Sequence, residues 1–212
     1  ILFIPLALAG IVLAAYRQLV VSKKMGSSQT AIEVLAGRWT MHIFDMRRDD
    51  ATADLARVLP NFSPLGMWLT LFPLWLKYKI SGRYFGYPRQ PEPGTENIAD
   101  LMIARTAFFD AIITRQFAEV EQFVILGAGY DTRAYGELGN SDTRFFELDQ
   151  PATQQMKTQW LGKAGIDSSH VTFVAVDFGK DELFDRLSEQ GYDPNKKALF
   201  LWEGVTLYLS EA

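Results

Sequence analysis

The segment from Phe123 to Asp149 constrains the fold of this chain more than any other. A short apolar run, 123–126, ends at the turn Gly127-Ala128-Gly129, and a second apolar run, 145–149, ends on an acid. Buried parallel strands typically read as short apolar runs, and glycines let the backbone pass close to a ligand. A strand, a glycine turn, a helix and a second strand that ends in a carboxylate form one half of a nucleotide-binding α/β fold, in which the acid binds a ribose.

Three details of this unit favour S-adenosylmethionine over a dinucleotide. Thr132 stands where the third glycine of G-x-G-x-x-G is expected, and Asp131 precedes it. A carboxylate at the mouth of the turn would repel a pyrophosphate, whereas it can face the cationic end of S-adenosylmethionine. A third strand-like run, 171–176, ends in Asp177-Phe178, an acid and an aromatic ring that suit an adenine.

Three residues near the turn leave alternatives open. Asp131 can contact the cofactor or act only as a turn residue that caps the next helix. Arg133 can pair with a substrate carboxylate or be solvated. Glu147 alternates with Asp149 along one strand, so both side chains should point to one face, one meeting the ribose and the other capping a neighbouring loop. The position of Asp149 in the motif makes it the preferred ribose ligand.

From Ile103 to Leu209 the chain resembles the leucine carboxyl methyltransferase superfamily, which includes bacterial O-methyltransferases. The resemblance rests on five segments that occur in order and together cover about half of the chain. They are ARTAFFD (104–110), LGAGYDTRAY (126–135), FFELDQP (145–151), VTFVAVDF (171–178) and LFLWEGVTLYL (199–209).

The resemblance implies cofactor-binding roles for six residues. The methionine carboxylate is held by Arg105, for which a surface ion pair with Asp100 or Glu119 is the alternative. The other roles are packing against the cofactor by Gly127, ribose binding by Asp149, adenine recognition by Asp177 and Phe178, and a place by the amino end for Glu203. The glycine turn adds Ala128, Gly129 and Asp131 as candidate contacts.

The implied fold is α/β, a Rossmann-like class I methyltransferase sheet with an N-terminal helical region. The sequence shows four strand-like runs, so we expect the C-terminal strands of such a sheet to lie beyond Ala212. A helix over 97–117, with Arg105 on it, should lead into the first strand. The expected domains are a membrane-anchor helix (1–24), a helical lid or interfacial region (25–96) and a truncated S-adenosylmethionine-binding domain (97–212).

Composition excludes several kinds of site. The net charge of the 212 residues is −4, which argues against broad binding to nucleic acid phosphates. The chain has no cysteine and two histidines, His42 and His170, so thiolate and three-histidine metal sites are excluded and no metal is expected. His170 is expected to cap the loop before the third strand.

The first fifteen residues are nearly all apolar, and Arg17, Lys23 and Lys24 follow at once. With Tyr16 at the boundary, this pattern favours a membrane anchor whose C-terminal side is cytoplasmic. A signal peptide and a soluble core helix are the alternatives, and without the anchor the protein would be cytoplasmic.

Two segments of the middle region differ in pattern. Residues 30–58 have helical spacing that indicates a lid helix. Residues 62–80 are apolar, contain Trp68 and Trp75, and are interrupted by Pro64 and Pro73. They can lie in a bilayer interface, form an apolar wall over the substrate pocket, or be core.

The sequence therefore predicts an S-adenosylmethionine-dependent methyltransferase acting on an oxygen of a small-molecule or protein acceptor. A carboxylate acceptor is favoured, because it is ionised at neutral pH and needs no general base. No catalytic residue is singled out. The alternatives are a non-catalytic, membrane-tethered S-adenosylmethionine-binding protein and a nicotinamide-dependent oxidoreductase.

Overall fold

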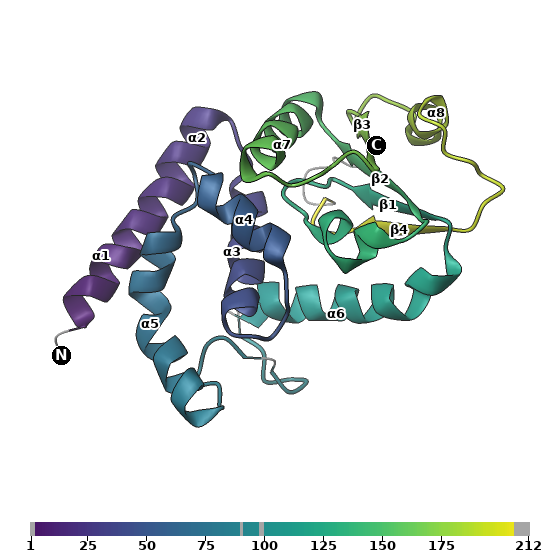
Figure 1. Ribbon diagram of the computed structural model, residues 1–212. Coiled ribbons are helices and arrows are strands. Elements are labelled where there is room, and N and C mark those ends of the chain that lie inside the picture. The colour runs from purple at the N-terminus through teal and green to yellow at the C-terminus, as the bar shows by residue number, and fades with distance from the viewer. Residues whose placement is uncertain (1–2, 90, 98–99, 206–212) are drawn as a thin grey trace. The chain divides into compact units, whose positions relative to one another are not determined.

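The computed structural model describes residues 3–89, 91–97 and 100–205, which form two compact units. The first unit, Ile1–Ala111, is helical, and the second, Ile112–Ala212, holds the sheet. The boundary between them falls inside helix α6 (Leu101–Gln116). Figure 1 shows the helices of the first unit and the sheet of the second.

The first unit begins with one long helix made of α1 (Ile4–Ala15), the π-helical turn η1 (Tyr16–Val21) and α2 (Ser22–Met25). The helices α3 (Gln29–Ile43), α4 (Asp50–Val58) and α5 (Pro64–Ser81) follow. The side chains of Ser28, Asp49 and Ser63 cap the N-termini of these three helices by accepting a backbone N–H. The prediction that residues 30–58 are helical is thus confirmed, but they form two helices in place of one.

The interruption expected within 62–80 does not occur, because α5 is one continuous helix. Pro64 occupies its first turn, where a backbone N–H has no helical partner in any case. Pro73 lies inside the helix at an exposed position. One missing backbone hydrogen bond there does not end a helix that packs extensively on α1.

The tryptophans of α5 pack against α3 in the first unit. Trp68 makes edge-to-face contacts with Trp39 and Trp75, at ring separations of 5.8 and 5.2 Å. The indole N–H of Trp75 donates to the carbonyl of Ile43 at 3.0 Å. Both tryptophans are half-buried, so their packing on α3 agrees with the core alternative, and the choice among the three alternatives for this segment stays a prediction.

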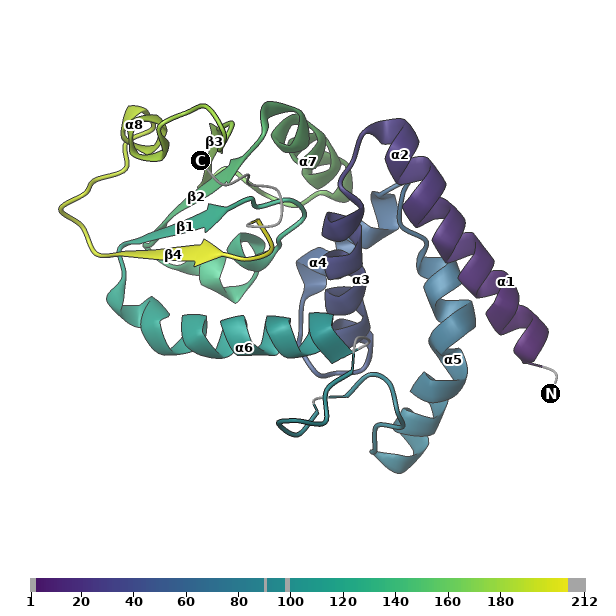
Figure 2. The same cartoon turned by 180° about the vertical axis from the view of Figure 1, so that it is seen from behind.

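Helices α1 and α5 lie side by side in both views (Figures 1 and 2). A Cβ built on Gly10 would stand 2.6 Å from the Gly66 carbonyl oxygen, and one on Gly66 would stand 2.8 Å from the Gly10 carbonyl oxygen. No side chain fits at either position. The two glycines therefore allow the helix backbones to touch.

The long N-terminal helix, Ile4–Met25, has 22 residues and a mean hydropathy of 1.8, and 6% of its apolar window is buried. By length and composition it could cross a membrane. Signal sequences and core helices of soluble proteins can have the same length and composition, so this feature alone is weak evidence of an anchor.

The second unit is built on a parallel sheet with strand order β3-β2-β1-β4. Its strands are β1 (Gln122–Leu126), β2 (Arg144–Asp149), β3 (Val171–Ala175) and β4 (Ala198–Trp202). Helices α7 (Pro151–Ala164) and α8 (Leu183–Glu189) connect them. All four predicted strands and the α/β class are confirmed.

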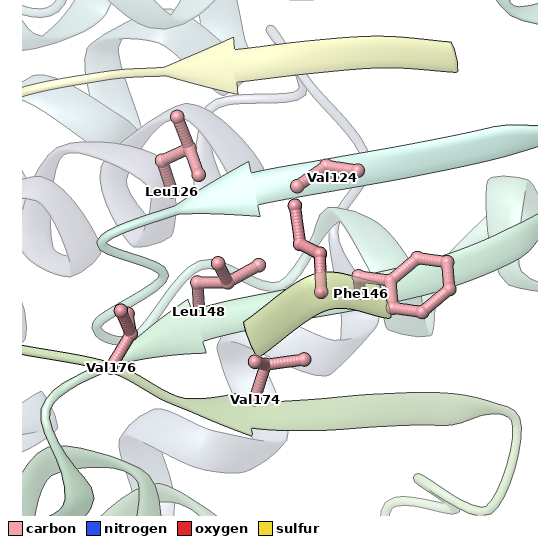
Figure 3. Close-up of a cluster of buried hydrophobic side chains, with 7 residues drawn as sticks. Val124, Leu126, Phe146, Leu148, Val174 and Val176 are labelled. Atoms are coloured by element: carbon pink, nitrogen blue, oxygen red, sulfur yellow. The ribbon is translucent and has the colours of Figure 1, made fainter. Parts of the chain in front are cut away.

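One face of the sheet carries an apolar cluster (Figure 3). Side chains from three adjacent strands and from α8 meet there, and all are buried: Val124, Leu126, Phe146, Leu148, Val174, Val176 and Leu187. Because successive side chains of a strand alternate between faces, Glu147 and Asp149 belong to the opposite face. The alternation predicted for these two acids is confirmed.

The prediction of an α-helix between the first two strands is wrong. The segment forms two short 3-10 helices, η4 (Arg133–Tyr135) and η5 (Glu137–Asn140). A Cβ on Gly139 would stand 2.3 Å from the carbonyl oxygen of Ala134, so the chain turns back on itself too tightly for an α-helix. Glycines at 136 and 139 also disfavour an α-helix.

Candidate functional site

The candidate residues of the second unit lie at one edge of the sheet. Since all four strands are parallel, their carboxyl ends meet at this edge. Gly127 follows β1, Asp149 ends β2, Asp177 follows β3 and Glu203 follows β4. The chain leaves β1 toward β2 and β3 and returns on the other side as β4, so the order reverses at β1. Ligands of open α/β sheets bind at such a point.

The glycine turn requires glycine at two positions. Gly127 and Gly129 have φ angles of 62° and 45°, in the left-handed region. A Cβ on Gly127 would stand 2.3 Å from Cγ2 of Val205, just after β4. In this structure Gly127 is thus needed for the close approach of Val205, and its packing against a cofactor stays a prediction. The backbone N–H of Ala128 donates to the Leu148 carbonyl at 2.9 Å, which ties the turn to β2.

Asp149 links the end of β2 to the glycine turn. One of its carboxylate oxygens accepts the N–H of Gly129 and the other accepts the N–H of Gln150, both at 2.7 Å. Burial raises the pKa of this carboxyl, and the two backbone hydrogen bonds oppose the rise. Two backbone N–H groups and the Thr153 side chain occupy three of the roughly four acceptor sites of the carboxylate, so the group keeps capacity for a ribose hydroxyl.

Asp131, Arg133 and Glu203 form a buried charge cluster beside the turn. Asp131 accepts the backbone N–H of Arg133 at 2.8 Å and its Nη1 at 2.6 Å. The same Nη1 donates to Oε2 of Glu203 at 2.8 Å. Asp131 thus acts as a turn residue, and its contact with a cofactor stays a prediction. The solvated alternative for Arg133 is wrong, because this residue is 3% exposed.

A second buried pair lies beneath the turn and was not predicted. Nζ of Lys157, on α7, stands 2.6 Å from Oε2 of Glu147 and donates to the carbonyl oxygen of Asp131 at 2.7 Å. Burial raises the pKa of Glu147, and the charge of Lys157 opposes this shift. Glu147 therefore supports the loop through Lys157, which agrees in outline with its predicted loop-capping role.

Asp177 and Phe178 lie where the sequence places them, but both have structural partners. Asp177 accepts the N–H of Gly179 at 3.1 Å and pairs with Lys180 at 2.9 Å. The hydrogen bond from Lys180 lowers the pKa of the Asp177 carboxyl. Phe178 packs on the apolar cluster of the sheet. Adenine recognition by these two residues stays a prediction.

Arg105 stands on α6 in the first unit. The two acids considered as its surface partners are engaged elsewhere, since Asp100 pairs with Arg89 at 2.7 Å and Glu119 with Lys197 at 2.5 Å. Its role at the methionine carboxylate stays a prediction. The end of the fifth matching segment, 206–209, lies outside the described residues.

The charge balance of the sheet edge fits S-adenosylmethionine better than a dinucleotide. Five acids stand at or beneath this edge with three basic partners: Asp131, Glu147, Asp149, Asp177 and Glu203 against Arg133, Lys157 and Lys180. Excess negative charge favours a ligand with a sulfonium and an ammonium group and disfavours a pyrophosphate. The residues present therefore fit the predicted cofactor.

Comparison with known proteins assigns the family. The family model described as leucine carboxyl methyltransferase matches residues 75–212. A protein of Mycobacteroides abscessus named a putative S-adenosyl-L-methionine-dependent methyltransferase is 32% identical over 165 residues, which cover 74% of this chain and 54% of that protein. A similarly named protein of Mycobacterium tuberculosis is 36% identical over 116 residues, covering 54% of this chain and 37% of its own length. The chain thus spans about half the length or less of these curated relatives, and it belongs to the leucine carboxyl methyltransferase family.

Proposed function

We propose that this chain forms the cofactor-binding part of a methyltransferase that transfers a methyl group from S-adenosyl-L-methionine to an oxygen of its acceptor. The names of the relatives and the family support the cofactor and the reaction class. The observation that carries the proposal is the position of Asp149, which is hydrogen-bonded to Gly129 of the glycine turn and still has an acceptor site for a ribose hydroxyl.

Each part of the cofactor has a candidate partner on this chain. Asp149 would accept the ribose hydroxyls, and Arg105 would hold the carboxylate. Asp131 and Glu203 would face the ammonium end, with Arg133 keeping both carboxylates in place. Asp177 and Phe178 would bind the adenine. When bound, the cofactor supplies a methyl group on a sulfonium, and the protein positions the acceptor and excludes water.

A carboxylate acceptor is favoured over a phenol or an alcohol. Both histidines of the chain have structural partners: Nδ1 of His42 accepts the N–H of Asp49 at 3.0 Å, and Nε2 of His170 lies 2.7 Å from the Ala134 carbonyl oxygen. A carboxylate reacts in its ionised form and needs no base. The family name points to the same chemistry.

The chemistry of the product tests this proposal. The full-length protein is incubated with methyl-tritiated S-adenosylmethionine and either carboxylic acids or phenols. A methyl ester releases volatile methanol in mild alkali, whereas a methyl ether does not. We expect alkali-labile label from the acids. Stable label on the phenols would contradict the carboxylate assignment, and intact cofactor binding with no transfer to any acceptor would favour a non-catalytic binding protein.

We also infer that the protein associates with a membrane and that its sheet unit lies on the cytoplasmic side. The support is the apolar helix Ile4–Met25 and the three basic residues within and after its apolar run, Arg17, Lys23 and Lys24. Cell fractionation of the full-length protein, and of a version deleted through Lys24, tests this inference. A full-length protein that stays in the soluble fraction at low and high salt would contradict it.

A further inference from the structure

Helices α1 and α5 carry most of the exposed large apolar side chains of the first unit. On α1, five such residues are 48–69% exposed: Ile4, Leu6, Leu8, Ile11 and Val12. On α5, four are 40–79% exposed: Leu65, Phe72, Leu76 and Ile80. A soluble monomer seldom exposes so many large apolar side chains on two neighbouring helices, so they call for a partner.

The two helices form one packed body, here called the α1–α5 pair. Gly10 of α1 touches Gly66 near the start of α5, and Phe3 stacks on Phe72 farther along it, with ring centroids 5.9 Å apart. The helices therefore run antiparallel, and Figure 2 shows them along each other from behind. The exposed apolar residues of α1 and α5 therefore belong to one helix pair.

Both ends of the α1–α5 pair are fixed to polar parts of the first unit. At one end, Nδ2 of Asn61 donates to Oγ of Ser22 at 3.1 Å, and Nη1 of Arg17 donates to the Pro60 carbonyl at 2.6 Å. At the other end, Lys79 pairs with Asp45. A pair that crossed a bilayer would carry one of these polar ends into or through the hydrocarbon, at a high cost. The polar contacts at both ends therefore favour a helix pair that lies along a membrane surface.

The charge of the segments that form the α1–α5 pair indicates which kind of surface the pair can bind. Residues 1–26 and 64–83 contain six basic side chains and no acidic one, although the net charge of the whole chain is −4. Lys23 and Lys24 stand at one end of the pair, and Lys77 stands at the other, where Lys79 is paired with Asp45. Basic residues at both ends can meet the same layer of anionic headgroups when the helix axes lie parallel to the membrane.

We propose that the α1–α5 pair is a membrane-binding surface that lies in the interface of an anionic bilayer, with its apolar side chains in the acyl region and its lysines among the headgroups. The pair then covers its apolar surface without crossing the membrane. This differs from a single N-terminal helix that spans the bilayer, because here α5 contributes to binding as much as α1.

Vesicle flotation of the full-length protein tests the contribution of α5. The vesicles contain phosphatidylcholine alone or phosphatidylcholine with phosphatidylserine. The parent should float with the anionic vesicles and be released in part by high salt. The double variant Leu76→Glu/Ile80→Glu should lower the bound fraction roughly tenfold or more, since two apolar side chains leave the acyl region. Both residues are exposed, and circular dichroism verifies that the variant is folded.

The matched control is Phe184→Glu, which removes a large apolar side chain, 59% exposed, on α8 in the second unit. It should bind vesicles as the parent does. If the α5 variant also binds like the parent, the proposal is wrong. If instead the parent is a dimer without vesicles and the α5 variant is monomeric with unchanged flotation, a second copy covers this surface and the proposal is overturned.

Cysteine labelling separates a surface-bound pair from a spanning helix. The printed sequence has no cysteine, so Lys24→Cys and Lys77→Cys each introduce one thiol at opposite ends of the pair. Inverted membrane vesicles from the expressing cells expose the cytoplasmic side to a membrane-impermeant maleimide. The proposal predicts that both thiols react. Reaction of one thiol alone, with the other reacting only after detergent is added, would show a crossing helix and overturn it.

Discussion

The buried ion pair between Lys157 and Glu147 provides a direct test of how the glycine turn is held. The substitution Lys157→Met keeps most of the side-chain volume and removes the charge. It leaves Glu147, whose side chain is 1% exposed, without its cationic partner. It also removes the hydrogen bond from Nζ to the Asp131 carbonyl, at 2.7 Å, so the loop that carries Asp131 and Arg133 loses its support from α7.

The expected size of the effect follows from burial. Removing one partner of a buried ion pair costs about 3–5 kcal/mol, compared with less than about 1 kcal/mol for an exposed pair. Glu147 limits the cost by taking up a proton, because burial already raises its pKa. We therefore expect the free energy of unfolding at neutral pH to fall by about 3 kcal/mol, the lower end of that range.

The dependence on pH has a definite sign. A carboxyl whose pKa is raised in the folded state contributes its full stabilisation below its unfolded pKa, near the ordinary value of 4.5. This contribution is lost as the pH rises through the folded pKa. Loss of Lys157 raises the pKa of Glu147 further. The difference in unfolding free energy between parent and Lys157→Met should therefore be small in acid and grow toward neutral pH.

Urea unfolding followed by circular dichroism at several pH values measures this difference. The double variant Lys157→Met/Glu147→Gln should recover most of the loss and show little pH dependence of its own. Lys163→Met, an exposed lysine on the same helix, is the control and should cost less than about 1 kcal/mol. A loss below about 1 kcal/mol for Lys157→Met, or one that does not change with pH, would refute a buried pair.

Three further substitutions test other parts of the account. Arg105→Lys should weaken S-adenosylmethionine binding roughly tenfold in calorimetry, since lysine cannot bind a carboxylate with two parallel hydrogen bonds; unchanged affinity would make Arg105 a surface charge. Gly127→Ala should lower the free energy of unfolding by about 1–3 kcal/mol, because its φ angle is 62° and the methyl group would stand 2.3 Å from Val205; partial recovery by Val205→Ala is expected, and a fully stable single variant would contradict the close approach. Gly66→Leu should destabilise the first unit by about 1–3 kcal/mol in thermal unfolding, since its side chain would meet the Gly10 carbonyl; unchanged stability would show that α1 and α5 do not touch there.

The sheet of the second unit could be predicted because its strands are short apolar runs that end in polar residues. The runs 123–126, 145–149 and 171–176 correspond to β1, β2 and β3 within one residue. Parallel strands then bring their carboxyl ends together, so the clustering of Gly127 and Asp149 followed from the pattern alone. The glycine turn could also be predicted, because its two glycines are typical of such a turn.

The support behind the turn could not be predicted, because it depends on tertiary contacts. Lys157 lies in a polar stretch of α7 and resembles a surface lysine until its pairing with Glu147 is known. Arg133 likewise resembles a solvated residue in the sequence. Its guanidinium nevertheless donates to Asp131 and to Glu203, and Glu203 is seventy positions away along the chain. Glu203 follows a different strand from the other two residues. No local pattern relates residues so far apart in sequence.

Calorimetric titration of the full-length protein with S-adenosylmethionine and with NAD⁺ tests the central claim most directly. The account predicts binding of S-adenosylmethionine, no binding of NAD⁺, and a loss of about 1–3 kcal/mol of binding free energy in Asp149→Ala, the cost of removing a buried polar partner. Asp142→Ala, an exposed acid ahead of β2, should bind like the parent. Binding of NAD⁺ in place of S-adenosylmethionine, or equal affinity of Asp149→Ala and the parent, would contradict the assignment of the cofactor site.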